Sequence, residues 1–270
     1  MKAKLLASLI ALTLATPVAA QSYRDRLPED EVIYFVLPDR FSNGDPQNDT
    51  GGIKGDRLKH GFDPTHKGFY QGGDLKGLTQ KLDYIQSMGV TAIWFAPIFK
   101  NKAVQGGPGQ ESAGYHGYWI TDFTSVDPHF GTNAEFKAFV DAAHKRGMKV
   151  YMDIVVNHTA DVIQYRDCPG DCAYRSIADY PYSRKGGVKG TPINTGFAGD
   201  GVQTDENFAK LTDMNFAYQP FVPEAEANIK VPAWLNDIRY YHHRGNSYWK
   251  GESVVYGDFV GLDDVAALVC

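Results

Sequence analysis

The sequence lacks a basic cluster, a second Cys or His pair at metal-binding spacing, and any internal repeat or low-complexity tract. Its 270 residues carry a formal net charge of −5, which argues against nucleic acid as a partner. It has only three cysteines, and the missing second pair disfavours a zinc site at Cys168 and Cys172. The length suffices for a large core, in one α/β barrel or in two smaller domains.

The apolar run at the N-terminus is too short to span a bilayer. Lys2 and Lys4 precede the apolar stretch Leu5–Leu14, and Val18–Ala20 has the small-residue pattern of a cleavage site. These features predict a secretory signal peptide over residues 1–20. The mature protein is then expected to be secreted or periplasmic, with no membrane contact after cleavage. The alternative is a buried N-terminal helix.

Cys168 and Cys172 bracket Pro-Gly-Asp in a short loop. In an oxidising compartment this arrangement favours a local disulfide, and Pro-Gly supplies the tight turn. Cys270, the last residue of the sequence, has no evident mate.

Apolar runs alternate with helical periodicity over the first part of the chain. Val32–Leu37 is typical of a strand, and Val90–Ala96 of a buried strand. Lys149–His158 is typical of a buried strand in a parallel sheet, covered on both faces. Between them, residues 74–88 and 132–147 show helical spacing, with Asp74 or Thr132 as N-cap and a glycine at each end. The order predicts βαβ units.

The connections in this predicted unit are asymmetric. Helix-to-strand turns are short, whereas strand-to-helix loops are long, as in β/α barrels, whose catalytic face lies at the carboxyl ends of the strands. Asn157 and His158 end the third strand and are expected at that face. Residues 159–257 lose periodicity and predict a small irregular subdomain inserted after strand three, in which Ala233–His242 forms one helix.

The loop after the first strand is dense in oxygen ligands. Asn43, Asp45, Asn48 and Asp49 lie within seven residues, which suits calcium, although the spacing is not that of an EF-hand. An Asx-rich turn without a metal explains the same composition. The residues alone leave both interpretations open.

Four motifs in the expected order resemble those of the α-amylase family, the family 13 glycoside hydrolases. They are Asp39–Phe41, Gly72–Asp74, Tyr115–Trp119 and Asp153–His158, within a resemblance over residues 31–265. The resemblance implies the N-terminal part of a (β/α)8 TIM barrel, with about three strands and an inserted irregular domain B after strand 3.

The same resemblance implies three segments and the positions that contact substrate. Residues 21–158 are expected to form the first part of the barrel, 159–257 domain B, and 258–270 a return towards strand four. His116, Tyr118 and His158 would line the sugar subsite next to the scissile bond. The Tyr118 ring offers a face for a pyranose, and the histidines can hydrogen-bond its hydroxyls. Asp153 would support the site from behind and not act as nucleophile.

The resemblance also implies calcium as a cofactor. The first family site would use Asn43, Asp45, Asn48, Asp49, the Gly72 carbonyl and Asp74. The second would use Asn157 and Asp264.

The sequence departs from the family at the catalytic carboxylates. Retaining cleavage of α-glucans such as starch, maltodextrin or cyclodextrin needs a nucleophile and an acid, and the family places both after strands that would follow Cys270. Asp122, Glu252 and Asp258 match no catalytic position. We therefore expect a glycosidase of α-amylase type whose chain is truncated and lacks its catalytic carboxylates. The alternatives are a non-catalytic carbohydrate-binding protein and a fragment that complements a separate C-terminal half.

Overall fold

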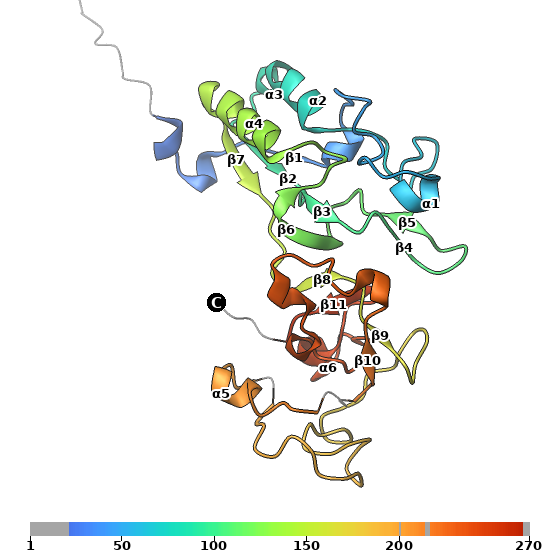
Figure 1. The fold of residues 1–270 in the computed structure, drawn as a ribbon. Coiled ribbons are helices and arrows are strands. Elements are labelled where there is room, and N and C mark those ends of the chain that lie inside the picture. The colour runs from blue at the N-terminus through green and yellow to red at the C-terminus, as the bar shows by residue number, and fades with distance from the viewer. Residues whose placement is uncertain (1–21, 200, 214–216, 267–270) are drawn as a thin grey trace, which may run out of the picture.

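A computed structural model describes residues 22–199, 201–213 and 217–266. The predicted signal peptide, residues 1–20, lies outside this range. Figure 1 shows two lobes: an upper lobe of residues 22–157, and a lower lobe formed by the described residues from 158 to 266. Within the described ranges, no helix is long and apolar enough to cross a bilayer.

The upper lobe is built on a three-stranded parallel sheet. Its strands are β1 (Ile33–Val36), β2 (Ala92–Phe95) and β7 (Lys149–Met152), in the order β1-β2-β7. The sequence predicted these three strands and their parallel arrangement. A parallel sheet brings the carboxyl ends of its strands to one edge, so the loops after β1, β2 and β7 share one face of the lobe.

The helices of the upper lobe are α1 (Arg57–His60), α2 (Leu75–Gln80), α3 (Leu82–Ser87) and α4 (Asn133–Lys145). The predicted helix over residues 74–88 is in fact two helices, because Lys81 leaves helical geometry at φ −101° and ψ 7°. The predicted N-caps are present: Asp74 accepts from Gly77 N, and Thr132 forms a capping box with Glu135. Figure 1 shows α2, α3 and α4 gathered on one side of the sheet.

One face of the sheet is open, so the prediction that both faces are covered was wrong. Ile33, Phe35 and Trp94 are 48%, 51% and 42% exposed, and the rings of Phe35 and Trp94 meet edge to face at 5.4 Å. The opposite face packs against the helices through buried residues such as Ile93 and Phe95. An apolar run alone does not reveal whether one face or two are covered, since both give the same composition.

The third strand is shorter than predicted. It ends at Met152, and Ile154 and Val156 further along the predicted run are 62% and 67% exposed. Its only ladder partner in the described chain is β2, which itself ends at Phe95, opposite Met152. Residues 153–156 therefore extend past the end of β2, and the chain pairs again only at His158, where β8 begins.

Two small ladders and three 3-10 turns complete the upper lobe. The ladders pair β3 (Phe99–Asn101) with β6 (Ile120–Val126), and β4 (Val104–Gln105) with β5 (Ser112–Ala113). The turns are η1 (Tyr23–Asp25), η2 (Pro28–Asp30) and η3 (Pro38–Arg40).

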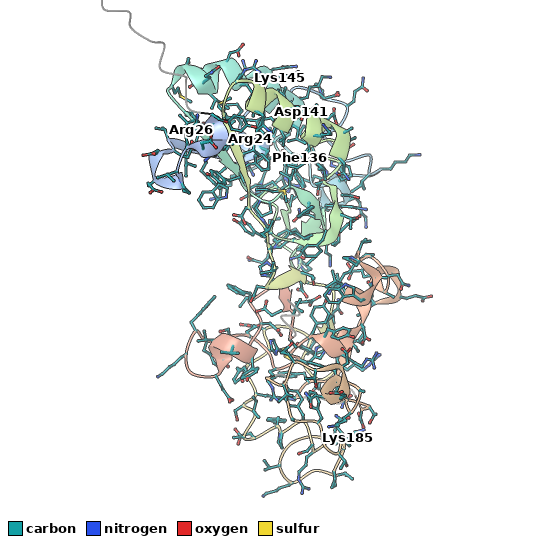
Figure 2. The ribbon with its side chains drawn as sticks, turned by 90° about the vertical axis from the view of Figure 1, so that its left-hand side faces the viewer. Arg24, Arg26, Phe136, Asp141, Lys145 and Lys185 are labelled. Carbon is teal, nitrogen blue, oxygen red and sulfur yellow. A yellow bond between two sulfur atoms is a disulfide. The ribbon has the colours of Figure 1, made fainter. Side chains whose placement is uncertain are left out.

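The lower lobe is irregular. Its strands β8 (His158–Ala160) and β11 (Leu262–Asp264) pair antiparallel, as do β9 (Gln164–Tyr165) and β10 (Pro220–Phe221). Its helical pieces are α5 (Asp205–Phe208), α6 (Ser253–Tyr256), η4 (Glu224–Glu226), η5 (Ala233–Asn236) and η6 (Ile238–Tyr240). Figure 2 shows Lys185 towards the far end of this lobe, away from Phe136 and Asp141 in the upper lobe.

The predicted single helix over Ala233–His242 is wrong. The chain forms the two 3-10 turns η5 and η6, and Asp237 between them has extended geometry at ψ 107°. The Asp237 side chain accepts from Arg239 N, and this local bond competes with helix continuation. In the same lobe, Cys168 and Cys172 are joined in a disulfide.

Polar contacts and a short backbone ladder join the lobes. Lys102 pairs with Glu226 at 2.6 Å and donates to the Asp161 carbonyl. Beside them, Val231 N donates to Thr121 O at 2.8 Å, and Phe123 N donates to Val231 O at 2.9 Å. The loop after β2 and strand β6 are thereby fixed against the lower lobe.

Candidate functional site

The loop after β2 presents an aromatic pair next to the sheet's carboxyl edge. Tyr118 N donates to His116 Nδ1 at 3.0 Å, and the two rings are stacked with centroids 5.8 Å apart. Gly117 between them adopts φ +85°, and a Cβ there would collide with the Pro97 carbonyl. Arg40 follows β1, and its Cζ lies 3.8 Å from the centroid of the Tyr115 ring, so that the guanidinium packs against the same loop.

His158 and Asp153 reach this aromatic pair from the segment after β7. His158 Nε2 donates to the Tyr118 carbonyl at 3.2 Å, and Tyr118 Oη donates to Asp153 Oδ2 at 3.3 Å. The structure therefore brings together His116, Tyr118 and His158, with Asp153 behind Tyr118. Tyr118 remains 37% exposed, so part of its ring faces solvent.

The electrostatics of this group favour neutral histidines. Burial, and then the nearby Arg40, lower the pKa of His116 to about 4. Burial also lowers the pKa of His158, against its hydrogen bond to Tyr118. Burial and the Asp153 carboxylate raise the pKa of Tyr118. At neutral pH the site therefore offers uncharged donors and acceptors beside an aromatic face, which suits neutral hydroxylated ligands.

Asp74 organises the loop after β1. Its carboxylate accepts from Gly77 N at 2.6 Å and from Asp45 N at 2.8 Å, and also from Gly44 N and Asn48 Nδ2. The side chain is fully buried. Both carboxylate oxygens of Asp74 thus accept hydrogen bonds from N–H groups, and these bonds hold the loop in its fold.

The other predicted calcium ligands gather around Asp49. Asn43 Nδ2 donates to Asp49 Oδ1 at 2.7 Å, and a Cβ on Gly72 would contact the same oxygen. The buried Asn48 Oδ1 has no hydrogen-bond partner among the described residues. Asp45 is paired with Lys76 at 3.1 Å. Amide, carboxylate and backbone oxygens are the donor set that calcium prefers, so the loop fits that ion.

Burial raises the pKa of Asp49, and the neighbouring Asp74 and Asp45 add to this rise. Over the described ranges, no group of three or more His, Cys, Asp or Glu side chains is arranged to hold a metal. Any cation in this loop would therefore depend on the amide oxygens and the Gly72 carbonyl as well as on carboxylates.

Asn157 and Asp264, the second predicted pair, also meet. Pairing of β8 with β11 sets Asp264 opposite His158, and the Asn157 side chain hydrogen-bonds the Asp264 carboxylate. Asp264 Oδ1 is buried without a hydrogen-bond partner in the described chain. Burial raises the pKa of Asp264 to about 6, against the hydrogen bond from Asn157. These residues also fit an oxygen-ligated cation.

The three carboxylates that match no catalytic position have structural partners. Asp122 Oδ1 accepts from Thr124 N and Oγ1, and Glu252 Oε1 accepts from Ile177 N. Asp258 accepts from Tyr165 Oη at 2.9 Å and is buried, which raises its pKa well above the ordinary value. Each of the three carboxylates therefore accepts hydrogen bonds that fix a backbone segment or, for Asp258, the Tyr165 ring.

A cavity of about 1020 Å³ lies where the lobes meet. The loop after β2 contributes Gln105, and the lower lobe contributes Asp161, Tyr165, Phe221 and Val260. Aromatic rings and polar side chains thus line the same space, but His116, Tyr118 and His158 are not among the residues that line it.

Sequence reasoning missed Phe259, whose ring lies 5.8 Å from that of His158. The two residues are far apart in the chain and are brought together by the β8–β11 ladder. Phe259 stands in an irregular stretch without periodicity, and no sequence signal in that stretch points to His158.

A three-stranded parallel sheet with long strand-to-helix loops, which carry aromatic, imidazole and carboxylate groups to one face, has the arrangement of the first part of a β/α barrel. Residues 35–235 match the family model "Alpha amylase, catalytic domain". The chain belongs to the α-amylase family.

Known proteins agree with this assignment. An alpha-amylase of Streptomyces lividans is 54% identical over 213 residues, which are 79% of this chain and 22% of that protein. A periplasmic alpha-amylase of Escherichia coli K12 is 41% identical over 145 residues, or 50% of this chain and 20% of that protein. A solved cyclomaltodextrin glucanotransferase with a three-domain arrangement has a TM-score of 0.55 at 32% identity. The matched region covers 87% of this chain and 38% of the chain of that structure. The chain thus spans well under half the length of these relatives.

Proposed function

We propose that this chain forms the sugar-binding wall of a retaining α-glucan glycosidase, in which His116, Tyr118 and His158 hold a glucose unit. The observation that carries the proposal is the convergence of these three side chains with Asp153 at the carboxyl edge of the parallel sheet. The Tyr118 ring packs against the apolar face of a pyranose, while neutral imidazoles exchange hydrogen bonds with its hydroxyls. The names of the relatives support α-glucans as the substrate class.

We further propose that the nucleophile and the acid of this reaction are not among the described residues. Retaining cleavage needs two carboxyl groups about 5 Å apart, one of them free to attack the anomeric carbon. Asp122, Glu252 and Asp258 each have structural partners, and Asp153 accepts from Tyr118. On this proposal the chain binds glucan, and cleavage or glucosyl transfer needs a further polypeptide segment that supplies the missing carboxylates.

A non-catalytic carbohydrate-binding protein remains the second candidate, favoured by those occupied carboxylates. Fragment complementation is the third, favoured by the exposed Ile33, Phe35 and Trp94 on the open sheet face. Co-expression with a C-terminal half of an α-amylase barrel distinguishes them, because only the third candidate gains hydrolytic activity. The relationship to a periplasmic alpha-amylase supports export of this chain, as the predicted signal peptide requires.

Replacement of Tyr118 with alanine tests the sugar-binding proposal. We expect the variant to lose binding of maltoheptaose by at least about tenfold, because a stacking ring and its orienting hydrogen bonds are removed together. Calorimetric titration measures the dissociation constant, and a reducing-sugar assay on starch runs in parallel. Tyr84→Ala is the control, since Tyr84 is 57% exposed on α3, away from the site.

Each outcome of this test is informative. Unchanged affinity in Tyr118→Ala, or a wild-type chain that binds no glucan, contradicts the proposed function. Release of reducing sugar by the wild-type chain alone contradicts the proposal that its catalytic carboxylates lie elsewhere.

We propose two calcium sites, one in the loop after β1 and one at the lobe junction. Asn43, Asn48, Asp49 and the Gly72 carbonyl would hold the first ion, with Asp45 at its edge and Asp74 folding the loop. Asn157 and Asp264 would contribute to the second. Calcium would neutralise crowded carboxylates and fix loops that border the sugar site.

Calcium added to chelator-treated protein is expected to raise Tm by several degrees, because an ion that binds only the folded state stabilises it. Thermal denaturation followed by circular dichroism measures the shift. Asp49→Asn should remove the part due to the first site and Asp264→Asn the part due to the second. A Tm that does not respond to calcium contradicts both sites.

A further inference from the structure

The side-chain amide of Gln105 joins the two lobes at the end of the β8–β11 ladder. Gln105 lies on β4 in the upper lobe and is buried. Its Nε2 donates to Gly261 O at 3.0 Å, and its Oε1 accepts from Asp161 N at 3.0 Å. Asp161 directly follows β8 and Gly261 directly precedes β11. The amide therefore bonds both strands at the point where their pairing ends.

Lys102 holds the same point from the same upper-lobe segment. Its Nζ donates to Asp161 O at 2.8 Å, while Gln105 accepts from Asp161 N. Two side chains of one segment thus bind both backbone polar groups of Asp161. We call Lys102, Gln105, Asp161 and Gly261 together the junction clamp.

The upper-lobe half of the junction clamp is bonded to the loop that carries Tyr118. Lys102 N donates to Trp119 O at 2.8 Å, and Trp119 N donates to Asn101 Oδ1 at 2.6 Å. Trp119 directly follows Tyr118 in the chain. The clamp therefore fixes this hydrogen-bonded segment, and Tyr118 with it, relative to the lower lobe.

Strand β8 connects the junction clamp to His158. Thr159 and Ala160, which separate His158 from Asp161, are fully buried, so the strand is held along its length. His158 Nε2 donates to Tyr118 O at 3.2 Å, and Nδ1 has no hydrogen-bond partner among the described residues. The place of the His158 ring therefore depends on where β8 lies.

We propose that Gln105 is a positioning residue for glucan binding, which holds the lower lobe in the orientation that sets His158 against Tyr118. This inference rests on the proposed function. Gln105 lies outside the family motifs and is separate from His116, Tyr118 and His158. It acts on the sugar site through β8 and not by contact with the ligand.

Removal of the Gln105 amide should cost little stability. Gln105, Asp161 and Gly261 all line the cavity of about 1020 Å³ at the lobe junction, which is large enough to admit water. Water can then bond the backbone groups of Asp161 and Gly261 that lose their partner, so they do not stay unsatisfied. A water molecule does not tie these groups to β4, and the alignment of the lobes is lost instead.

Gln105→Met tests the proposal, because methionine has a similar volume and makes neither hydrogen bond. Nitroxide labels at Lys145→Cys and Lys185→Cys, in a Cys270→Ser background, report the distance between the lobes (Figure 2). Pulsed electron paramagnetic resonance should show a broader distance distribution in Gln105→Met. Calorimetric titration without labels should show maltoheptaose binding weakened about 3- to 10-fold, as for loss of one or two hydrogen bonds.

Two further variants complete the comparison. Gln86→Met is the control, since Gln86 Nε2 donates to Arg146 O at 3.1 Å within the upper lobe, and it should change neither measurement. Lys102→Met combined with Gln105→Met should broaden the distribution further and weaken binding more, because Asp161 then loses both side-chain partners.

The contrary results are distinct. A distance distribution that stays narrow in both clamp variants overturns the proposal. A broader distribution with unchanged maltoheptaose affinity reduces Gln105 to a structural role and also overturns it. A wild-type chain that binds no glucan contradicts the proposed function and the positioning role together, whereas the distance distribution independently shows whether Gln105 holds the lobes.

Discussion

Replacing Lys230 with methionine is expected to lower the free energy of unfolding by about 3–5 kcal/mol, the usual cost of stranding a buried charge. Lys230 is 2% exposed, pairs with Asp263 at 2.8 Å, and donates to Tyr241 Oη at 3.0 Å. Methionine fills the same volume but leaves Asp263 without its cation. Urea unfolding followed by fluorescence measures the change.

The loss should be larger at pH 8 than at pH 5. Burial raises the pKa of Asp263, and Lys230 opposes this rise. Without the lysine, the folded state prefers a protonated Asp263, so stability is present at low pH and is lost as pH rises through the raised pKa.

Two companion variants isolate the charge effect in this experiment. Lys230→Met combined with Asp263→Asn should recover part of the stability, since the amide can still accept from Val162 N and Ile163 N. Lys137→Met is the exposed control, because its pair with Asp141 on α4 lies at the surface and contributes less than about 1 kcal/mol. An equally large effect of Lys137→Met, or no pH dependence in Lys230→Met, would contradict this explanation.

Replacing Gly117 with alanine is expected to abolish glucan binding and to lower the free energy of unfolding by about 3 kcal/mol or more. The alanine Cβ would collide with the Pro97 carbonyl, and φ +85° is itself unfavourable for alanine. The backbone between His116 and Tyr118 must therefore move, and both rings move with it. Calorimetric titration and urea unfolding report the two effects.

Gly109 provides the matched control for this substitution. It has nearly the same backbone, φ +81°, but a Cβ there would meet nothing within 4 Å. Gly109→Ala should therefore cost only the intrinsic strain, about 1–2 kcal/mol, and leave binding intact. If both variants lose similar stability, backbone strain rather than collision with Pro97 is the cause.

Local signals in the sequence predicted much of the upper lobe. The apolar runs identified β1, β2 and β7, and the spacing of Thr132 and Glu135 identified the start of α4, because these features depend on residues close together in the chain. The open face of the sheet could not be predicted. Ile33 and Phe35 have the composition of core residues, and their exposure depends on which segments pack against them.

In the candidate site, too, residues close in sequence could be predicted to lie together, whereas contacts between distant segments could not be predicted from the sequence pattern. His116 and Tyr118 are neighbours in sequence, so a short motif sufficed to propose them together. The contact of His158 with Phe259 arises from the ladder between β8 and β11, and no sequence pattern predicted it. Asn157 and Asp264 are brought together by the same ladder, and only the family resemblance had linked them. That ladder joins distant segments, and three-residue strands leave too little periodicity to predict the pairing from the pattern alone.

The ladder between β8 and β11 also determines where the lower lobe can tolerate insertions and deletions. The segment from His158 to Asp264 has its two ends paired in this ladder, so the chain enters and leaves the lower lobe at neighbouring positions. For a flexible loop between fixed ends, doubling the length costs only about 0.6 kcal/mol of closure entropy. Insertions and deletions far from the ladder, for example near Lys185, are thus thermodynamically cheap, whereas a shift of one residue at His158 would turn every side chain of that strand to the opposite face. The length of the lower lobe can therefore vary at little cost in stability, provided that the pairing of β8 with β11 is kept.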